Sequence, residues 1–574
     1  MDDKKIFESE ACGIFELEGA EVDAEEVPTA GNSFFDKSYF GTRVLILAPH
    51  PDDEINIAGN MILTLAAAKA EIFVAYSTNG DFEQTAEVRA QEAVDALKIL
   101  GVPSDKIIFL GYGDGHKLSD RPTQSPAGHI ETYAAKTFVD YAKKTFGRHS
   151  SYTRENFKHD LKSLLLELRA NIIFCVDFDS HADHRTLSIL FEEALGEILS
   201  ERSDYRPEVY KKLAYATAFT AAPDFYAPNL RPTKKPKLGE TDTYDFDLID
   251  RANYVWENRV RFPVMYWQTI LKGNPIAEAI FAHKSQRNEW NALRIINSDE
   301  IFFERRTDSQ TFSAQVTATS GDVTKIRDFK IIDTANVEIC PAQIGNNLWQ
   351  GEKIFFSWQE PAQIQQIVIY GNPLDDTPAK ISLRLELANA QAVIDKAGIS
   401  LDNVKTFDVE LPSHGRPLVI DTEKIFVIRA EISIVDAGQN FGLAEVEFFT
   451  NAEPLHKIPP FIKLTVNDNF IYRYDVPYEV DKVSVGLYRF HVDEPVKITA
   501  TVGDENILSE MLTDDELILN FGKATEIILT AEVIGSDIYD RAIIRRVGDF
   551  AQIQLKVFQW LDKLRVHKIR KVDR

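Results

Sequence analysis

A histidine and three carboxylates lie within five residues of one another, directly after an apolar run. The stretch VLILAPHPDDEINIAGN, residues 44–60, contains His50, Asp52, Asp53 and Glu54. Imidazole and carboxylate groups can hold a metal such as zinc, and they can also act as general acids and bases. Acidic residues are equally typical of a helix N-terminus, where they accept from free backbone N–H groups. For Glu54 both interpretations stay open.

A second polar group follows another apolar run. The sequence DFDSHADHR places His181, Asp183 and His184 directly after the strand expected at residues 171–178. Three protein ligands with one open position form a hydrolytic zinc site, and Asp52 would remain unbound as a base. Histidines near helix starts are common, so it is the pairing of the two groups that predicts a metal site.

The elements that must position these groups alternate between two types. Between residues 41 and 310, short apolar runs such as RVLILAP, AEIFVAYST, DKIIFLGY and ANIIFCVDF are separated by amphipathic segments such as residues 85–102 and 156–169. This alternation predicts an α/β, Rossmann-like catalytic domain with a mostly parallel sheet. Because sites in such sheets lie beyond the carboxyl ends of the strands, we expect both polar groups at one edge.

The remaining chain has a different texture. Alternating runs punctuated by Gly, Pro, Asn and Asp predict an all-β sandwich at 311–452. The same pattern predicts a smaller β-rich domain, a second sandwich, at 453–548. Residues 549–574 have the apolar spacing of an amphipathic helix. An acidic N-terminal extension, residues 1–40, holds 11 acids and three lysines.

Composition excludes several classes of function. The net charge of −25 argues against nucleic-acid binding, which needs clustered cations. Three widely spaced cysteines indicate neither a disulfide framework nor a thiolate zinc site. No export signal or membrane-spanning run is recognisable, so we expect a cytoplasmic protein.

The C-terminal segment leaves two interpretations open. Residues 556–574 contain seven Lys/Arg and two Asp. A basic amphipathic helix of this kind can make peripheral contact with an anionic membrane, or it can dock on its own acidic protein. The sequence does not determine the oligomeric state.

The motifs APHPDDE and HADH together resemble those of the PIG-L/LmbE-like family of zinc-dependent N-deacetylases. The resemblance extends through YSTNGD (76–81), VRAQEAVDALKILGV (88–102), LGYGDG (110–115) and AHKSQ (282–286), and covers most of residues 41–305. It implies bound Zn²⁺, although a His/His/Asp set also accepts other divalent metals.

The resemblance implies a role for each matching residue. The zinc ligands would be His50, Asp53 and His184. Asp52 would be the general base, and a protonated His181, oriented by Asp183, would assist at the oxyanion or the leaving amine.

Other positions match residues that only some members of the family have. Arg89 and Asp114 correspond to residues that contact sugar hydroxyls in some family members, whereas Arg89 could also pair with Glu92 and Asp114 could simply favour its glycine-rich turn. Some members place a tyrosine at the position of Asp179, and here that role would need a tyrosine from residues 112–160. The candidates are Tyr112, Tyr133 and Tyr152.

The predicted sandwich resembles another family. Its segments FFSWQEPAQIQQIVIYGNP (355–373) and NFGLAEVEFFT (440–450) are similar to strands of discoidin-like, galactose-binding modules. The resemblance implies glycan binding through loops at one end, with Trp349 and Trp358 stacking on sugars. The alternative is that both tryptophans are packing residues.

The expected function is a zinc-dependent hydrolase that removes the N-acetyl group from an amino sugar in a glycan or glycoconjugate. Two alternatives are an amidase acting on another amide and a glycan-binding scaffold with a degenerate site. The complete set of His50, Asp52, Asp53, His181 and His184 argues against the scaffold.

Overall fold

The computed structural model describes residues 32–115, 121–178, 181–214, 260–263, 271, 273–286, 295–296, 299–331, 346–347, 350–372, 377–389, 401–413, 416–438, 441–453, 456–467, 473–512 and 516–571, and all structural statements concern these residues. Among them, every helix is too short or too polar to cross a lipid bilayer.

The first unit contains a seven-stranded sheet in the order β3-β2-β1-β4-β5-β7-β6. Its strands are β1 (Arg43–Ala48), β2 (Glu71–Thr78), β3 (Ile107–Tyr112), β4 (Ile172–Val176), β5 (Glu208–Lys212), β6 (Val260–Phe262) and β7 (Glu300–Arg305). The first five strands in this order are parallel, and β7 is antiparallel to both neighbours. The predicted α/β fold with a mostly parallel sheet is therefore confirmed. The strand order reverses between β1 and β4, which is where open sheets of this type place their sites.

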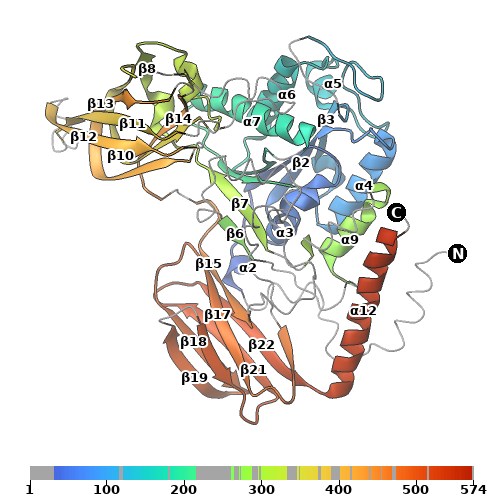
Figure 1. Cartoon of the computed structure of the whole chain (residues 1–574). Helices are drawn as coiled ribbons and strands as arrows, with labels where there is room; N and C mark the ends of the chain where they lie inside the picture. Colours follow the sequence, from blue (N-terminus) through green and yellow to red (C-terminus); the bar gives the residue numbers. More distant parts are fainter. Residues whose placement is uncertain are drawn as a thin grey trace.

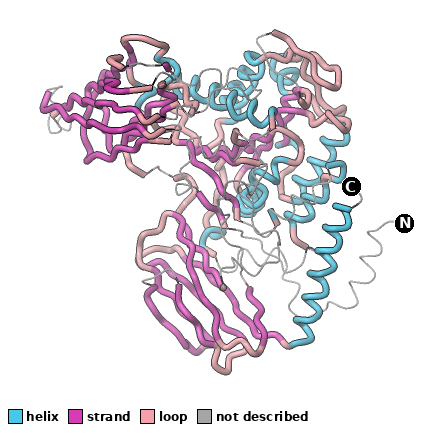
Figure 2. The backbone as a smooth tube through the Cα atoms, in the orientation of Figure 1, coloured by secondary structure: helices cyan, strands magenta, loops and turns pink. Residues whose placement is uncertain are grey.

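Helices cover this sheet, whereas the other two units consist mainly of strands (Figures 1 and 2). The helices are α2 (Ser33–Asp36), α3 (Asp53–Ala67), α4 (Ala86–Ile99), α5 (Tyr141–Phe146), α6 (Arg154–Leu168), α7 (Ala182–Glu201) and α9 (Pro275–Ala282). Side-chain caps define several starts: Thr85 begins α4, Thr153 begins α6, and Asn274 precedes a proline at the first position of α9.

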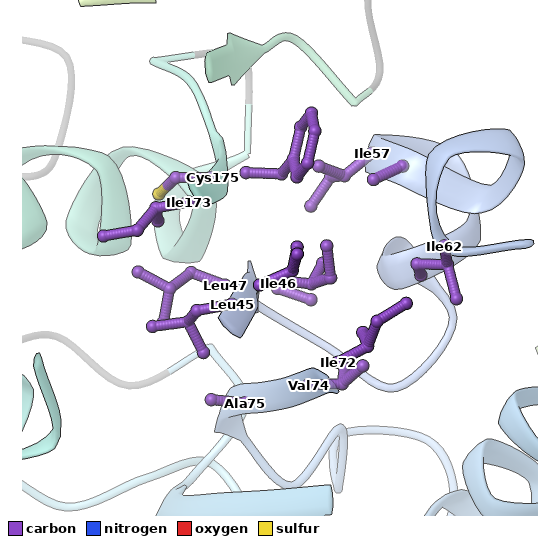
Figure 3. Close-up of a cluster of buried hydrophobic side chains, with 14 of the residues drawn as sticks. Leu45, Ile46, Leu47, Ile57, Ile62, Ile72, Val74, Ala75, Ile173 and Cys175 are labelled. Carbon is purple, nitrogen blue, oxygen red and sulfur yellow. The ribbon is translucent and has the colours of Figure 1, made fainter. Parts of the chain in front are cut away.

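Strand β1 lies at the centre of the hydrophobic core. Its residues from Val44 to Ala48 are buried on both faces. Figure 3 shows Leu45 and Leu47 on one side of the strand, while Ile46 lies on the side of Ile57 and Ile62 from α3. Burial on both faces places the strand in the interior of the sheet, and the chain leaves Ala48 at the carboxyl edge of that sheet.

The second unit, which follows β7, is antiparallel. Its seven strands are β8 (Gln315–Ala318), β9 (Asn346–Asn347), β10 (Lys353–Gly371), β11 (Ala379–Ala388), β12 (Leu401–Leu411), β13 (Leu418–Asp436) and β14 (Gly442–Phe449). They form one sheet in the order β12-β11-β13-β10-β14-β9, with β8 beside β10, around a separate core.

The two tryptophans considered for glycan stacking have different outcomes. Trp358 is buried, its indole N–H donates to the Gln310 carbonyl at 2.9 Å, and its ring packs edge-on against Phe448. The stacking role predicted for Trp358 is therefore wrong, and the packing interpretation holds. Trp349 lies outside the described residues.

The third unit packs two sheets around its own core. A three-stranded sheet, β15-β17-β20, faces a five-stranded sheet, β16-β22-β21-β18-β19. The strands are β15 (Phe461–Val466), β16 (Arg473–Pro477), β17 (Lys482–Phe490), β18 (Val496–Val502), β19 (Glu505–Leu512), β20 (Glu516–Asn520), β21 (Glu526–Val533) and β22 (Tyr539–Val547). Helix α12 (Asp549–Lys571) follows.

The units are joined by shared contacts. Phe461 and Phe490 from the third unit belong to the core cluster of the first unit. Beside them, His456 Nδ1 lies 3.1 Å from Glu208 Oε1 and 3.9 Å from Glu304 Oε1. Phe34 of α2 packs into the same core, so the predicted extension 1–40 is part of the body from residue 32 onward. The domain boundaries expected from the sequence stay predictions.

Arg305 connects the first and second units. This buried residue of β7 lies 3.5 Å from Glu447 of β14, donates to the Phe329 carbonyl at 2.9 Å and stacks over the Phe329 ring. Removal of a buried cation leaves its partner carboxylate without compensation, which costs about 3–5 kcal/mol. We therefore expect Arg305→Ala to lower the free energy of unfolding by about that amount in urea titrations followed by circular dichroism.

The matched control is Lys353→Ala. Lys353 pairs with Glu431 at 2.6 Å on the same sheet, but its side chain is 45% exposed. Exposed pairs contribute about 1 kcal/mol or less. Equal effects of the two variants would show that Arg305 does not join the units as described.

Candidate metal and catalytic site

The loop between β1 and α3 holds the first polar group in a strained conformation. Asp52 has a φ of 136°, a region that residues with a side chain rarely adopt, and it precedes the first residue of α3. Its backbone N–H donates to Glu54 Oε2 at 2.7 Å. Glu54 is fully buried, and its carboxylate stabilises the turn that presents Asp52.

The three predicted metal ligands lie in direct contact. Asp53 Oδ2 is 2.9 Å from His50 Nδ1 and 3.1 Å from His184 Nε2. His50 comes from the end of β1, and His184 comes from the first turn of α7 after β4. The expected meeting of the two groups at one sheet edge is therefore observed, while their role as ligands stays a prediction.

Other groups extend this cluster. His50 Nε2 lies 3.1 Å from Asp183 Oδ2 and 3.3 Å from Asp114 Oδ1. The His181 ring centroid lies 4.8 Å from that of His50 and 4.9 Å from that of His184. One set of possible metal ligands consists of His50, His181 and His184. Another consists of His50, Asp114, His181 and Asp183. Within each set, one ligand atom from each residue lies within 4.8 Å of the others.

The donor set fits a divalent cation. Burial by itself would lower the pKa of His50, but Asp114, Asp183 and Asp53 outweigh it and raise that pKa well above the usual value. Burial by itself would raise the pKa of Asp53, but His184 and His50 hold it well below its usual value. The buried carboxylates thus require positive charge, which a zinc-like ion bound by imidazole and carboxylate can supply.

The surroundings of His181 favour its neutral form. Burial, followed by the neighbouring His50 and His184, lowers the pKa of His181 to about 4, so the ring is neutral at rest near pH 7. The assistance expected from a protonated His181 during the reaction stays a prediction. Its orientation also has another origin: the Asp183 N–H faces His181 Nδ1 at 3.3 Å, while the Asp183 carboxylate lies closer to His50 and accepts from Gly115 N at 2.8 Å.

Arg89 lies behind the predicted base. It is 2% exposed, its Nη2 is 3.1 Å from Asp52 Oδ1, and the same nitrogen donates to the Pro51 carbonyl. The alternative pairing with Glu92 is not observed, because Glu92 accepts from the backbone and hydroxyl of Ser285. Contact of Arg89 with a sugar hydroxyl stays a prediction.

A supporting residue was missed by the sequence reasoning. His283 Nε2 lies 2.7 Å from Glu54 Oε1, and both side chains are fully buried. His283 therefore fixes the Glu54 carboxylate, which in turn accepts from the Asp52 backbone N–H. The signal was present in AHKSQ, which carried the family resemblance without a role for its histidine.

Asp114 and one tyrosine line the edge of the cluster. The Asp114 N–H donates to Asp81 Oδ1 at 2.7 Å, and the Tyr133 hydroxyl donates to the other oxygen of Asp81. By contrast, Tyr112 and Tyr152 are fully buried and pack together. Tyr133 is thus linked to Asp114 through Asp81, which engages its hydroxyl.

Comparison with known proteins matches one segment to a family. Residues 45–195 match the model described as PIG-L: GlcNAc-PI de-N-acetylase. A curated relative, N-acetylglucosaminyl-phosphatidylinositol de-N-acetylase from Bos taurus, is 25% identical over 122 residues, which are 20% of this chain and 48% of the relative. The chain thus spans about half the length of that relative.

Two solved structures match the chain at low identity. The N,N'-diacetylchitobiose deacetylase of Pyrococcus horikoshii has 17% identity, a TM-score of 0.28 and coverage of 54% of this chain and 94% of its own. A CBM32 module from Clostridium perfringens, bound to GalNAc-β-1,3-galactose, has 12% identity, a TM-score of 0.17 and coverage of 24% and 95%. These TM-scores are too low to transfer a function.

The match at residues 45–195 includes the loop after β1 and the start of α7, which together carry the His/Asp cluster. Within this longer chain, residues 45–195 are similar to the PIG-L family model.

Proposed function

We propose that this chain is a metal-dependent de-N-acetylase that releases acetate from an N-acetylated amino sugar of the N-acetylglucosamine type. The observation that carries the proposal is the buried contact of Asp53 with His50 and His184, beside Asp52, at the carboxyl edge of the sheet. The PIG-L match over the same segment supports the reaction class.

His50, Asp53 and His184 would hold the metal, with Zn²⁺ as the proposed ion. When bound, the ion supplies a Lewis acid and lowers the pKa of a water molecule to about 7. Asp52 then accepts the proton of the attacking water. Arg89 lies 3.1 Å from the Asp52 carboxylate and orients it from behind.

His181 lies beside His50 and His184 and would serve the leaving amine. Because its resting imidazole is neutral, it must receive a proton during turnover before it can donate one. A ring with a lowered pKa is a strong acid once protonated, which suits transfer to an amine. The Gly115 N–H donates to the Asp183 carboxylate at 2.8 Å, and this hydrogen bond fixes the backbone of Gly115 relative to α7.

The substrate is the finer part of the proposal. The additional β units suggest a glycan or glycoconjugate larger than a monosaccharide, and glycan binding by residues 311–452 remains part of the proposal without a role for Trp358. Acetate detection across N-acetylated sugars, nucleotide sugars and lipid-linked glycans tests it. Release of another acid from another amide would favour the amidase alternative. A cytoplasmic location stays a prediction.

One test of the proposed function separates the base from the metal ligands. Asp52→Asn keeps the size of the side chain but cannot accept the proton of water, so we expect turnover to fall by about 10²- to 10⁴-fold. Metal content per chain, measured by elemental analysis, should stay unchanged. His184→Ala should instead lose the metal together with activity, because it removes a nitrogen ligand.

Exposed residues of the same domain provide matched controls. Asp105→Asn and His159→Ala change an exposed aspartate and a half-exposed histidine away from the cluster, and both should retain metal and activity. An active Asp52→Asn enzyme would exclude Asp52 as the base. Full metal content in His184→Ala would exclude His184 as a ligand.

Another test concerns His283 as a positioning residue. His283→Ala removes the partner of Glu54 and so loosens the carboxylate that holds the Asp52 N–H. Loss of such an outer contact typically costs about 10- to 100-fold in activity. We expect that loss in kcat, with little change in KM and in metal content.

The conservative variant distinguishes positioning from general destabilisation. His283→Gln retains an N–H donor for Glu54 and should recover part of the lost kcat. A parallel fall of kcat in both variants, with a matching fall in thermal stability, would instead assign His283 a purely structural role.

A further inference from the structure

Helix α12 contacts the first unit through the face that carries Asp562. The helix leaves the third unit and runs beside the first (Figure 1). Its Asp562 is 9% exposed and accepts from the Leu271 N–H at 3.2 Å. Leu555 and Phe558 lie on the same face and are half-buried. Docking on the protein itself, one of the two interpretations that the sequence left open, therefore occurs through this inner face.

The opposite face exposes a continuous apolar surface, called here the outer stripe. Its residues recur at helical spacing: Phe550, Ile553, Val557, Trp560, Leu561 and Leu564. Phe550 is 73% exposed and Trp560 is 58% exposed. Six of the 21 exposed large apolar residues in the described chain thus lie within residues 550–564, and so large a cluster marks an interaction surface.

The charge of the segment favours an anionic partner. Residues 556–574 carry seven Lys/Arg and two Asp, a net charge of +5. Because the whole chain carries −25, the remainder carries −30. An anionic surface therefore repels most of the protein and attracts this segment, where the apolar stripe and the cations occur on one helix.

The same charges disfavour a second copy of the chain on the stripe. Phe550, Ile553, Val557, Trp560 and Leu564 alternate at spacings of three and four, as in a coiled-coil seam. The positions that flank this seam contain one acidic residue, Asp549 at the start of the helix, and four basic ones, Lys556, Lys563, Lys568 and Arg570, together with Gln554 and Leu561. Pairing two such helices brings like charges together, which is destabilising.

We propose that the outer stripe of α12 docks on an anionic lipid bilayer, with Phe550 and Trp560 inserted among the headgroups and the neighbouring cations on the lipid phosphates. The helix would lie along the membrane surface. This inference does not depend on the proposed deacetylase activity.

Sedimentation of the full chain with lipid vesicles tests the proposal. We expect binding to vesicles of phosphatidylcholine and phosphatidylglycerol, little binding to phosphatidylcholine alone, and weaker binding at high salt. Trp560→Ser should lower the partition coefficient about tenfold, because it removes a large inserted side chain. Lys556→Glu should weaken binding only to the anionic vesicles.

Ile518→Ser is the matched control. Ile518 lies on β20 and is 56% exposed, so the change removes a comparable apolar group from another surface, and binding should not change. Deacetylation of a water-soluble substrate should be equal in wild type and Trp560→Ser, which separates this test from that of the proposed function.

Three results would overturn the proposal. One is absence of binding to anionic vesicles at low salt. Another is equal, salt-insensitive binding to both vesicle types, or equal binding of wild type and Trp560→Ser. The third is a lipid-free dimer that Trp560→Ser converts to a monomer in light-scattering measurements, because the stripe would then be occupied by a second copy.

Discussion

The parallel pairing of β1 with β4 is the constraint on which the site depends. The two strands pair from Val44 with Ile172 to Leu47 with Cys175, and all four residues are buried. Because the two strands are parallel, the chain leaves both carboxyl ends at the same edge of the sheet, and the strand order reverses at this pair. Residues separated by more than 130 positions, such as His50 and Asp183, therefore lie 3.1 Å apart.

A set of buried polar contacts offsets the cost of the strained loop at Asp52. The positive φ of Asp52 and the burial of Glu54 are both unfavourable by themselves. Glu54 accepts from the Asp52 N–H and faces His283, while Arg89 contacts the Asp52 carboxylate. These partners come from different elements, so the position of the Asp52 carboxylate depends on how those elements pack together.

The additional units are integrated with this domain. Arg305 contacts Glu447 of the second unit, and Phe461 and Phe490 of the third unit complete the first core. Helix α12 returns from the third unit to the first at Leu271. Changes in the appended units can therefore act on the stability of the domain that carries the site, independently of any ligand that they bind.

The sequence by itself determined the α/β class and the convergence of the two polar groups. These features depend on local patterns: apolar runs of strand length, helical periodicity, and polar residues directly after a strand. The tail could likewise be assigned as an amphipathic helix from residue spacing alone, because each turn of a helix is specified by residues three and four positions apart.

Only the tertiary structure decided which partners the side chains have. Arg89 contacts Asp52 and not Glu92, His283 contacts Glu54 from 229 positions away, and burial gives His181 a neutral resting state. Trp358 is a packing residue because its strand faces a core. Contacts between distant segments and the burial of charge depend on how the elements pack, and neither property is encoded in local spacing.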